Sequence, residues 1–163
     1  MIFESDNDRC EYFMGKAIEQ AKIARSIGEV PVGAVITRND EIITAAFNRR
    51  ETGRNALYHA ELDAIDKACT ILGGWRLWQC ELYVTLEPCP MCAGAVINSR
   101  IPKVVFGAYD MKSGSAGSLI NLFEVPYNHK PEVIGGVLEE ECSGMLSEFF
   151  AELRIKLKSK RNI

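Results

Sequence analysis

Two cysteines three residues apart, the first of them between two prolines, place the strongest constraint on this chain. They lie in the run 86–92, Leu-Glu-Pro-Cys-Pro-Met-Cys. Proline is favoured at the first position of a helix, where its missing N–H costs nothing, so the run predicts a strand that turns into a helix near Cys89. Residues three apart on a helix share a face, which would point Cys89 and Cys92 at one ion. The positive helix N-terminus favours their thiolate forms, which bind metal.

His59 and Glu61, about thirty residues upstream, extend this pattern. His59 can supply a nitrogen ligand, and three protein ligands with an open fourth position are typical of a catalytic zinc. Glu61 follows two residues later, so it is expected to serve a metal-activated water without binding the metal. His-x-Glu followed by Pro-Cys-x-x-Cys is similar to the signature of the zinc-dependent nucleobase deaminases. The sequence therefore predicts one Zn²⁺ per chain.

Two other interpretations of the cysteine pair stay open at this point. The pair could be a thioredoxin-like redox couple, although the His-x-Glu partner disfavours this. A closed structural zinc would need a fourth ligand, for which Cys69, Cys80 and His129 are the candidates. Nothing in the sequence pairs any of these three with the Cys-x-x-Cys.

Length and composition indicate an ordinary soluble protein. A chain of 163 residues suggests a single domain, 1–163, with a sizeable core. Hydrophobic residues make up 47% and charged residues 25%, and no apolar run is long enough to span a membrane. The start of the chain is acidic and polar, unlike a signal peptide. Six cysteines without a secretion signal then favour a reducing cytoplasm over a disulfide framework.

The charge is unevenly distributed. The formal net charge of −3 excludes a general nucleic-acid-binding protein. The C-terminal segment nevertheless carries five basic residues with no acid among them: Arg154, Lys156, Lys158, Lys160 and Arg161. Charge pattern alone leaves open whether this tail is a solvated helix end or a phosphate-binding segment.

Hydrophobic periodicity and turn residues predict four helices and five strands. Helices are expected over 10–27, 59–72, 89–99 and 139–158, and strands over 30–37, 41–47, 81–86, 103–108 and 132–137. Strands that alternate with helices after an initial hairpin imply a mixed five-stranded sheet covered on both faces, a three-layer α/β/α fold. The core face of the last helix is expected to comprise Cys142, Met145, Leu146, Phe149 and Leu153.

Beyond the metal motif, the chain resembles the cytidine-deaminase-like superfamily and, within it, the bacterial tRNA-specific adenosine deaminases. Similar segments cover nearly the whole chain, at 29–35, 48–49, 82–89, 91–95, 99–100, 104–108, 117–119, 128–129 and 149–150. The resemblance implies a homodimer that hydrolyses adenosine to inosine at the wobble position of a tRNA anticodon stem-loop. It carries the family's metal ligands to His59, Cys89 and Cys92, and its proton shuttle to Glu61.

The resemblance also implies substrate contacts. Base contacts carry over to Val32, Asn48 and Ala60, and anticodon-loop contacts to Asp110, Lys112 and Asn128. Each has a plainer alternative as a core residue, a strand cap or a loop surface residue. Asn48 stands out, because an amide can donate and accept at a purine edge at the same time.

Tyr58 departs from the family, which usually has a small residue directly before the metal-ligand histidine. An aromatic ring there either stacks on a base or narrows the pocket for a smaller substrate.

A second possible function is therefore deamination of free guanine, cytosine or a pterin, which Tyr58 and the acidic net charge favour. The basic tail and Phe149-Phe150 favour RNA instead. A third possible function is that of a non-catalytic binding module stabilised by zinc. The presence of Glu61 argues against it, because a structural zinc site does not need a carboxylate at that position.

Overall fold

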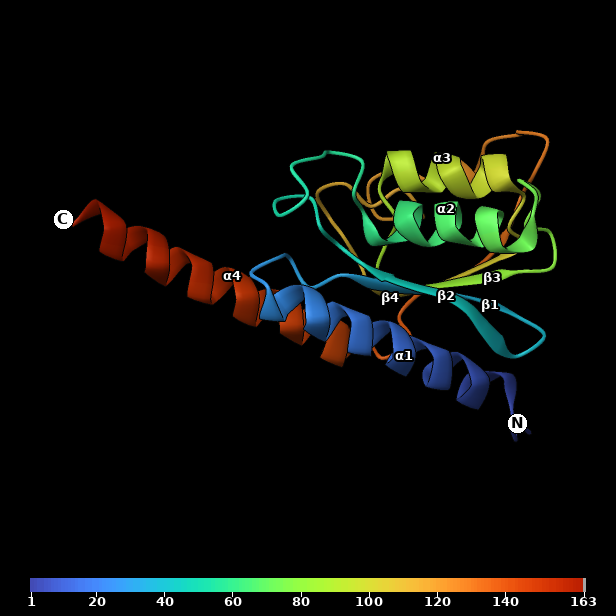
Figure 1. The fold of residues 1–163 in the computed structure, drawn as a ribbon, viewed down its shortest axis with the longest axis horizontal. Helices are drawn as coiled ribbons and strands as arrows, with labels where there is room; N and C mark the ends of the chain where they lie inside the picture. The colour runs from blue at the N-terminus through green and yellow to red at the C-terminus, as the bar shows by residue number, and fades with distance from the viewer. Residues whose placement is uncertain (163) are drawn as a thin grey trace.

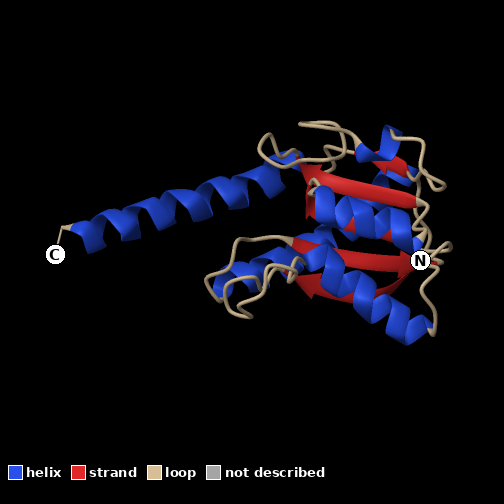
Figure 2. Ribbon diagram, turned by 90° about the horizontal axis from the view of Figure 1, so that it is seen from above, coloured by secondary structure: helices blue, strands red, loops and turns tan. Residues whose placement is uncertain are grey.

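A computed structural model of the protein, which describes residues 1–162, contains one mixed sheet between two layers of helices (Figure 1, Figure 2). The strand order is β2-β1-β3-β4-β5. The first strand pairs antiparallel with the second and the third, and the last three strands run parallel. The strands are β1 (Gly33–Arg38), β2 (Glu41–Phe47), β3 (Glu81–Leu86), β4 (Lys103–Ala108) and β5 (Glu132–Ile134).

The helices divide between the two faces of this sheet. They are α1 (Asp6–Ser26), α2 (Ala60–Leu72), α3 (Pro90–Ser99) and α4 (Glu139–Arg161), with a short 3-10 helix η1 (Leu122–Glu124). Helices α2 and α3 cover one face, and α1 and α4 lie against the other (Figure 1). The predicted three-layer fold is confirmed. Among the described residues, no helix combines the length and the apolar character needed to cross a bilayer.

A tight hairpin at Asn39 and Asp40 starts the sheet. Both residues have positive φ, 52° and 61°, the conformation that a type I′ hairpin turn requires. Asparagine and aspartate tolerate this left-handed region better than other side chains do. The hairpin folds β2 back along β1 and leaves the other edge of β1 free to pair with β3.

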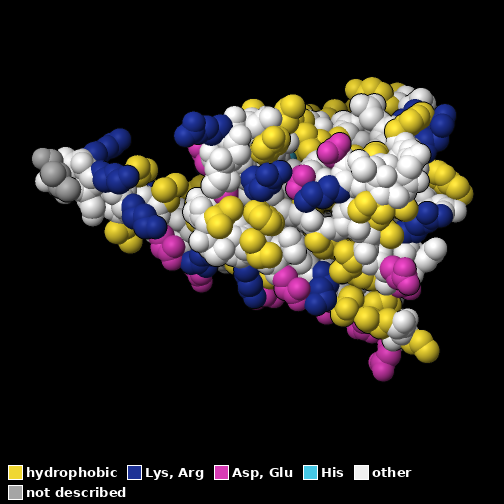
Figure 3. Space-filling model, viewed as in Figure 1, with side chains coloured by type: hydrophobic (Ala, Val, Ile, Leu, Met, Phe, Trp, Pro, Cys, Tyr) yellow, Lys and Arg dark blue, Asp and Glu magenta, His cyan; other side chains and the backbone are white. Residues whose placement is uncertain are grey.

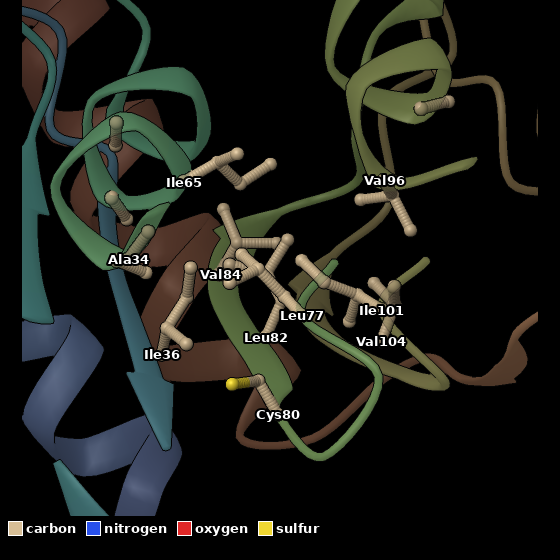
Figure 4. Close-up of a cluster of buried hydrophobic side chains, with 14 of the residues drawn as sticks. Ala34, Ile36, Ile65, Leu77, Cys80, Leu82, Val84, Val96, Ile101 and Val104 are labelled. Carbon is tan, nitrogen blue, oxygen red and sulfur yellow. The ribbon is translucent and has the colours of Figure 1, made fainter. Parts of the chain in front are cut away.

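Two apolar clusters fill the space between the layers, because successive residues of a strand face opposite sides. In β1, Ala34 and Ile36 pack under α2 and α3, while Val35 packs under α1. Figure 4 shows the first cluster, to which α2 contributes Ile65 and α3 contributes Val96. Burying each of the larger side chains contributes about 1.5–3 kcal/mol.

Some predicted boundaries were wrong. The first strand begins at Gly33 rather than residue 30, because Val32 donates its N–H to the carbonyl of Val30 in a turn around Pro31. The last strand ends at Ile134, before Gly136 with its φ of 83°. Helix α1 begins four residues earlier than expected, at Asp6.

The last helix was only partly predicted. Its buried side chains are Cys142 and Met145, whereas Leu153, expected on the core face, is 39% exposed. Every described residue from Leu153 onward is exposed, and α4 projects beyond the sheet (Figure 2). Arg25 at the end of α1 holds the base of this projection through ion pairs of 2.8 Å to Glu148 and Glu152.

Candidate active site

The N-termini of α2 and α3 bring three potential metal ligands together. His59 is the N-cap of α2 and Cys89 is the N-cap of α3, so each helix begins one residue later than the sequence predicted. Cys92 lies in the first turn of α3 and is fully buried. The Nδ1 atom of His59 lies 3.6 Å from the Sγ atom of each cysteine. All three ligand atoms lie within 4.8 Å of one another.

This geometry fits a zinc ion. Zn–N and Zn–S bonds of about 2.1 and 2.3 Å at a tetrahedral angle separate nitrogen from sulfur by about 3.6 Å. Nδ1 is then the nitrogen ligand of His59, and the fourth position is left for water or substrate. In the part of the chain that the structure describes, no other group of three or more metal-binding side chains converges in this way. His129 is engaged elsewhere, with Nε2 2.7 Å from the carbonyl oxygen of Ile101.

Ionisation of the two cysteines also suits a cation. Hydrogen bonds from Cys92 and His59 to the thiolate lower the pKa of Cys89 to about 4. The pKa of Cys92 is raised, because Cys92 donates that hydrogen bond and is buried. The pKa of His59 is raised by its hydrogen bond with Cys89. Cys89 is therefore a thiolate that accepts a hydrogen bond from the thiol of Cys92. Binding of a metal ion to both sulfurs would release the proton of that thiol.

Glu61 lies in the first turn of α2, directly beside the three ligands. Its side chain is 4% exposed, and burial raises the pKa of its carboxyl group to about 7, although the charge of His59 opposes the rise. A carboxyl group that titrates near neutral pH can both accept and donate a proton, as general acid–base catalysis requires. A divalent cation nearby would favour the ionised form.

A cavity of about 550 Å³ opens above this group. It gathers residues from the start of β1, the end of β2, the loop after β4 and helix α4. The predicted site residues that line it are Val32, Asn48, His59, Ala60, Glu61, Cys89, Asp110 and Lys112. The remaining three predicted residues, Tyr58, Cys92 and Asn128, do not line it. Cys92 lies beneath the surface of the cavity, as expected of a buried ligand.

The three predicted base contacts form one wall. Ala60, the first residue of α2, is fully buried, and Val32 and Asn48 are each 8% exposed. The backbone N–H of Asn48 donates to the carbonyl of Val32 over 3.0 Å, which joins the end of β2 to the segment before β1. All three residues are therefore close enough to a ligand to touch it, and all three are also part of the packed interior.

Of the three predicted anticodon-loop contacts, Asp110 and Lys112 line the cavity and Asn128 does not. Asp110 uses its carboxylate within its own loop, where it accepts from the N–H of Lys112 at 2.9 Å and from the hydroxyl of Ser113 at 2.7 Å. It therefore shapes the cavity rim on which Lys112 is carried. Asn128 is exposed in the segment after η1, outside the cavity lining.

The ring of Tyr58 packs on the loop 49–55 and not on the cavity. A Cβ atom on Gly53 would lie 2.3 Å from the ring, so only glycine permits this approach. The guanidinium group of Arg49 lies 4.8 Å from the ring centroid, in cation–π geometry. The aromatic residue that departs from the family thus stacks on its own loop, and its side chain is 36% exposed.

Sequence reasoning missed several cavity residues: Arg50, Glu87, Met111, Leu146 and Phe150. Leu146 and Phe150 are four residues apart on α4, and this spacing marks a shared face but not what the face covers. Glu87 is 1% exposed and accepts from the hydroxyl of Ser118 at 2.8 Å. An acidic residue at the end of a buried strand was the available signal for it.

Comparisons with known proteins agree with this geometry. Residues 7–108 match the family model of the cytidine and deoxycytidylate deaminase zinc-binding region. The tRNA-specific adenosine deaminase of Bacillus subtilis is 59% identical over 93% of this chain and 94% of its own. A solved structure from a study of A-to-I editing by tRNA:A34 deaminases at the wobble position of transfer RNA is similar with a TM-score of 0.80. It has 39% identity and covers 83% of this chain and 99% of its own.

A further solved structure is a guanine deaminase from Bacillus subtilis, with 39% identity and a TM-score of 0.58. That match covers 61% of this chain and 64% of the guanine deaminase. The match to the Bacillus subtilis tRNA-specific adenosine deaminase is both more identical and more extensive. The chain belongs to the zinc-dependent cytidine and deoxycytidylate deaminase superfamily and, within it, to the tRNA-specific adenosine deaminases.

Proposed function

We propose that this protein is a zinc-dependent hydrolase that converts adenosine to inosine at the wobble position of tRNA. The observation that carries the proposal is the buried carboxyl group of Glu61 beside a three-ligand zinc site at the base of an open cavity. A structural zinc site has no use for a carboxyl group held there at such a cost in desolvation. The tRNA-specific adenosine deaminase of Bacillus subtilis and the solved structure from the study of tRNA:A34 deaminases match this chain over 93% and 83% of its length.

The chain's own residues perform the proton transfers. His59, Cys89 and Cys92 would hold a zinc ion, which would activate a water molecule as the nucleophile near neutral pH. Glu61 accepts the proton of the attacking water and delivers it to the ring nitrogen beside carbon 6 of the adenine. The same carboxylate then takes the remaining proton from the hydroxyl group added at carbon 6 and passes it to the amino group, which leaves as ammonia. The balance is adenosine plus water to inosine plus ammonia.

The substrate is proposed to be an anticodon stem-loop with its first anticodon base splayed into the cavity. A base inside a stacked loop cannot reach a buried zinc, so enzymes that act on bases take them out of the stack. Val32, Asn48 and Ala60 would contact the splayed base, and Lys112 on the rim would lie near the loop backbone. Tyr58, which directly precedes His59 and is 36% exposed, would stack on a neighbouring base.

The projecting end of α4 supports an RNA partner. In Figure 3, side chains of lysine and arginine follow the projecting helix, which carries five basic residues after Leu153 and no acidic ones. A helix that extends past the body with charge of one sign is suited to a phosphate backbone. These residues lie on the same chain segment as Leu146 and Phe150, which line the cavity.

We also propose a homodimer in the cytoplasm, where tRNA is modified. Large apolar side chains near the end of α2 remain exposed in the single chain, with Ile71 62%, Trp75 51% and Trp78 62% accessible. A second copy that covered them would remove apolar area from water. Sedimentation at micromolar concentration should give twice the chain mass.

The decisive test is to incubate the protein with a tRNA that has adenosine at the first anticodon position and to measure inosine there. The matched control is the same tRNA with guanosine at that position, and Glu61→Gln serves as the inactive enzyme. Inosine in the first reaction alone supports the proposal, and its absence over many hours with a zinc-loaded protein contradicts it.

A second candidate is deamination of a free base, which the similarity to a guanine deaminase favours. Salt separates the two functions, because phosphate contacts release counterions and RNA binding therefore weakens steeply with salt. A neutral base in a cavity barely responds. Ammonia release from free guanine that is insensitive to salt, with no inosine in tRNA, would replace the proposal by this second function.

A further inference from the structure

Glu29 is a fully buried carboxylate that the reaction itself does not use. It precedes β1, is 0% exposed and does not line the cavity. Its Oε1 atom accepts from the backbone N–H of Thr52 at 2.5 Å, and its Oε2 atom lies 3.5 Å from Nδ2 of Asn48. Burying a carboxylate is costly unless its oxygens are hydrogen-bonded. The two contacts join Glu29 to a cavity residue and to the loop that follows β2.

These contacts define the orientation of the Asn48 amide. Nδ2 faces two groups that can only accept, the carboxylate of Glu29 and the carbonyl of Val30 at 3.3 Å. Oδ1 accepts from a group that can only donate, the N–H of Arg50 at 3.2 Å. Rotating the amide by 180° would place donor against donor at one end and acceptor against acceptor at the other. Asn48 therefore presents its amide to the cavity in one sense only.

We propose that Glu29 is a positioning residue for base recognition, which fixes the Asn48 amide and holds the loop 49–55 at the edge of the cavity. This inference rests on the proposed function, in which Asn48 contacts the target base. Glu29 touches neither base nor metal and acts only through Asn48 and Thr52. Arg49, the first residue of the same loop, stacks on the ring of Tyr58, so the loop that Glu29 holds also carries the cation of this pair.

Glu29 would therefore influence which base is accepted without contacting that base, by fixing the amide of Asn48. A site built to hydrogen-bond a particular base edge rejects other bases because its own polar groups would be left unpaired. If the amide of Asn48 is free to rotate, part of the population presents a donor where an acceptor is needed. Turnover of the correct substrate then falls, while zinc binding and the proton shuttle are intact.

The test is a double-variant cycle on deamination of an anticodon stem-loop. Glu29→Gln keeps the shape of the side chain, but its amide must turn an NH₂ group toward either the N–H of Thr52 or Nδ2 of Asn48. We expect kcat/KM to fall about ten-fold, the net effect of one lost hydrogen bond. In an Asn48→Ala background the same change should cost less than about two-fold, because the residue it positions is gone.

Glu81→Gln is the matched control. Glu81 also accepts two hydrogen bonds, from Arg9 at 2.6 Å and from Tyr83 at 2.7 Å, but it lies outside the cavity lining. Its effect should be the same with and without Asn48. Zinc content and melting temperature are measured for every variant, and zinc should stay near one per chain.

A second pair of variants, in which the carboxylate and the amide exchange positions, tests the same contact if Glu29→Gln alone folds poorly. Asn48→Asp sets two carboxylates against each other and should lower the melting temperature. Adding Glu29→Gln should restore part of the loss, because an amide and a carboxylate again face each other, although the carbonyl of Val30 still faces an acceptor. No restoration, or equal costs of Glu29→Gln with and without Asn48 in an active enzyme, would overturn this inference alone. No inosine from the wild-type protein would overturn the proposed function and this inference with it.

Discussion

The floor and the rim of the cavity are built in different ways. The floor consists of His59, Glu61, Cys89 and Cys92, on the first turns of two helices that lie on the sheet. The rim consists of Arg50 from the loop 49–58, residues 109–113 and one face of α4, and its loops are held by hydrogen bonds and stacking. Rigid elements fix catalytic groups more tightly than loops do. From this difference we propose that the floor carries out the chemistry and that the rim determines the choice of substrate.

This division predicts two classes of variant. A change in the floor should abolish reaction on every substrate, tRNA or free nucleoside. A change in the rim should weaken action on an anticodon stem-loop and leave a small substrate unaffected. A rim variant that abolished all reaction, or a floor variant that impaired RNA only, would break the comparison.

The largest effect is expected from the metal ligands. His59→Ala or Cys92→Ser should reduce bound zinc, abolish turnover and lower the melting temperature, because metal binding is coupled to folding. Metal analysis and a thermal melt on the same samples check this. Cys69→Ser and Cys80→Ser are the matched controls and should keep zinc. Zinc near one per chain in both ligand variants would show that the ligands are assigned wrongly.

The next effect is expected at Glu61. Glu61→Gln should keep the fold and the zinc but lower kcat by about 10²–10⁴-fold, the usual contribution of general acid–base catalysis. Zinc content and product formation are measured together. Activity within a few-fold of wild type would mean that another group moves the proton, and loss of zinc would make Glu61 a ligand.

The floor could be predicted from the sequence because its geometry is local. The spacing of three residues between Cys89 and Cys92 is converted by helix geometry into a shared face. The spacing of two residues between His59 and Glu61 places both at the start of one helix, α2. Pro90 marks where the second helix starts. Only the approach of the two helix ends to each other needed the tertiary structure.

The rim could not be predicted in this way, because its contacts join distant segments. Glu29 meets Asn48 and Thr52 across nineteen and twenty-three residues. Leu146 and Phe150 have a helical period that marks an apolar face but does not reveal that it closes a cavity. The same limit explains the error at Leu153, where the period continues after the body of the protein has ended.

A smaller effect, confined to RNA, is expected from the end of α4. Cutting the chain after Leu153 removes five basic residues that are all exposed. If they contact phosphates, RNA affinity should fall, and the slope of log affinity against log salt should flatten by about one unit per lost contact. Binding titrations at several salt concentrations measure this.

The cut should leave the fold intact, because the buried residues of α4, Cys142 and Met145, lie well before it. Replacing Lys156, Lys158 and Lys160 by Gln is the matched control that keeps the helix and removes only charge. Deamination of a free nucleoside should not change in either variant. An unchanged salt slope would make the projecting end an ordinary solvated helix.

The smallest effect is expected at Tyr58, and it sharpens the division between floor and rim. The ring, and not the hydroxyl group, makes the contacts with Gly53 and Arg49. Tyr58→Phe should therefore be nearly silent. Tyr58→Ala removes a stacking face worth about 1–3 kcal/mol per base and should weaken action on an anticodon stem-loop about ten-fold. Initial rates on the stem-loop and on a free nucleoside measure both.

The control lies next to Tyr58 in space. Arg49→Gln removes the cation above the ring but keeps the ring, so it should cost less than Tyr58→Ala on RNA. If Tyr58 instead closed the cavity around a small substrate, its hydroxyl would bind that substrate. Tyr58→Phe would then reduce activity on a free base, and Tyr58→Ala would admit larger bases. Because the ring packs on Gly53 outside the cavity lining, neither change should alter reaction on a free nucleoside.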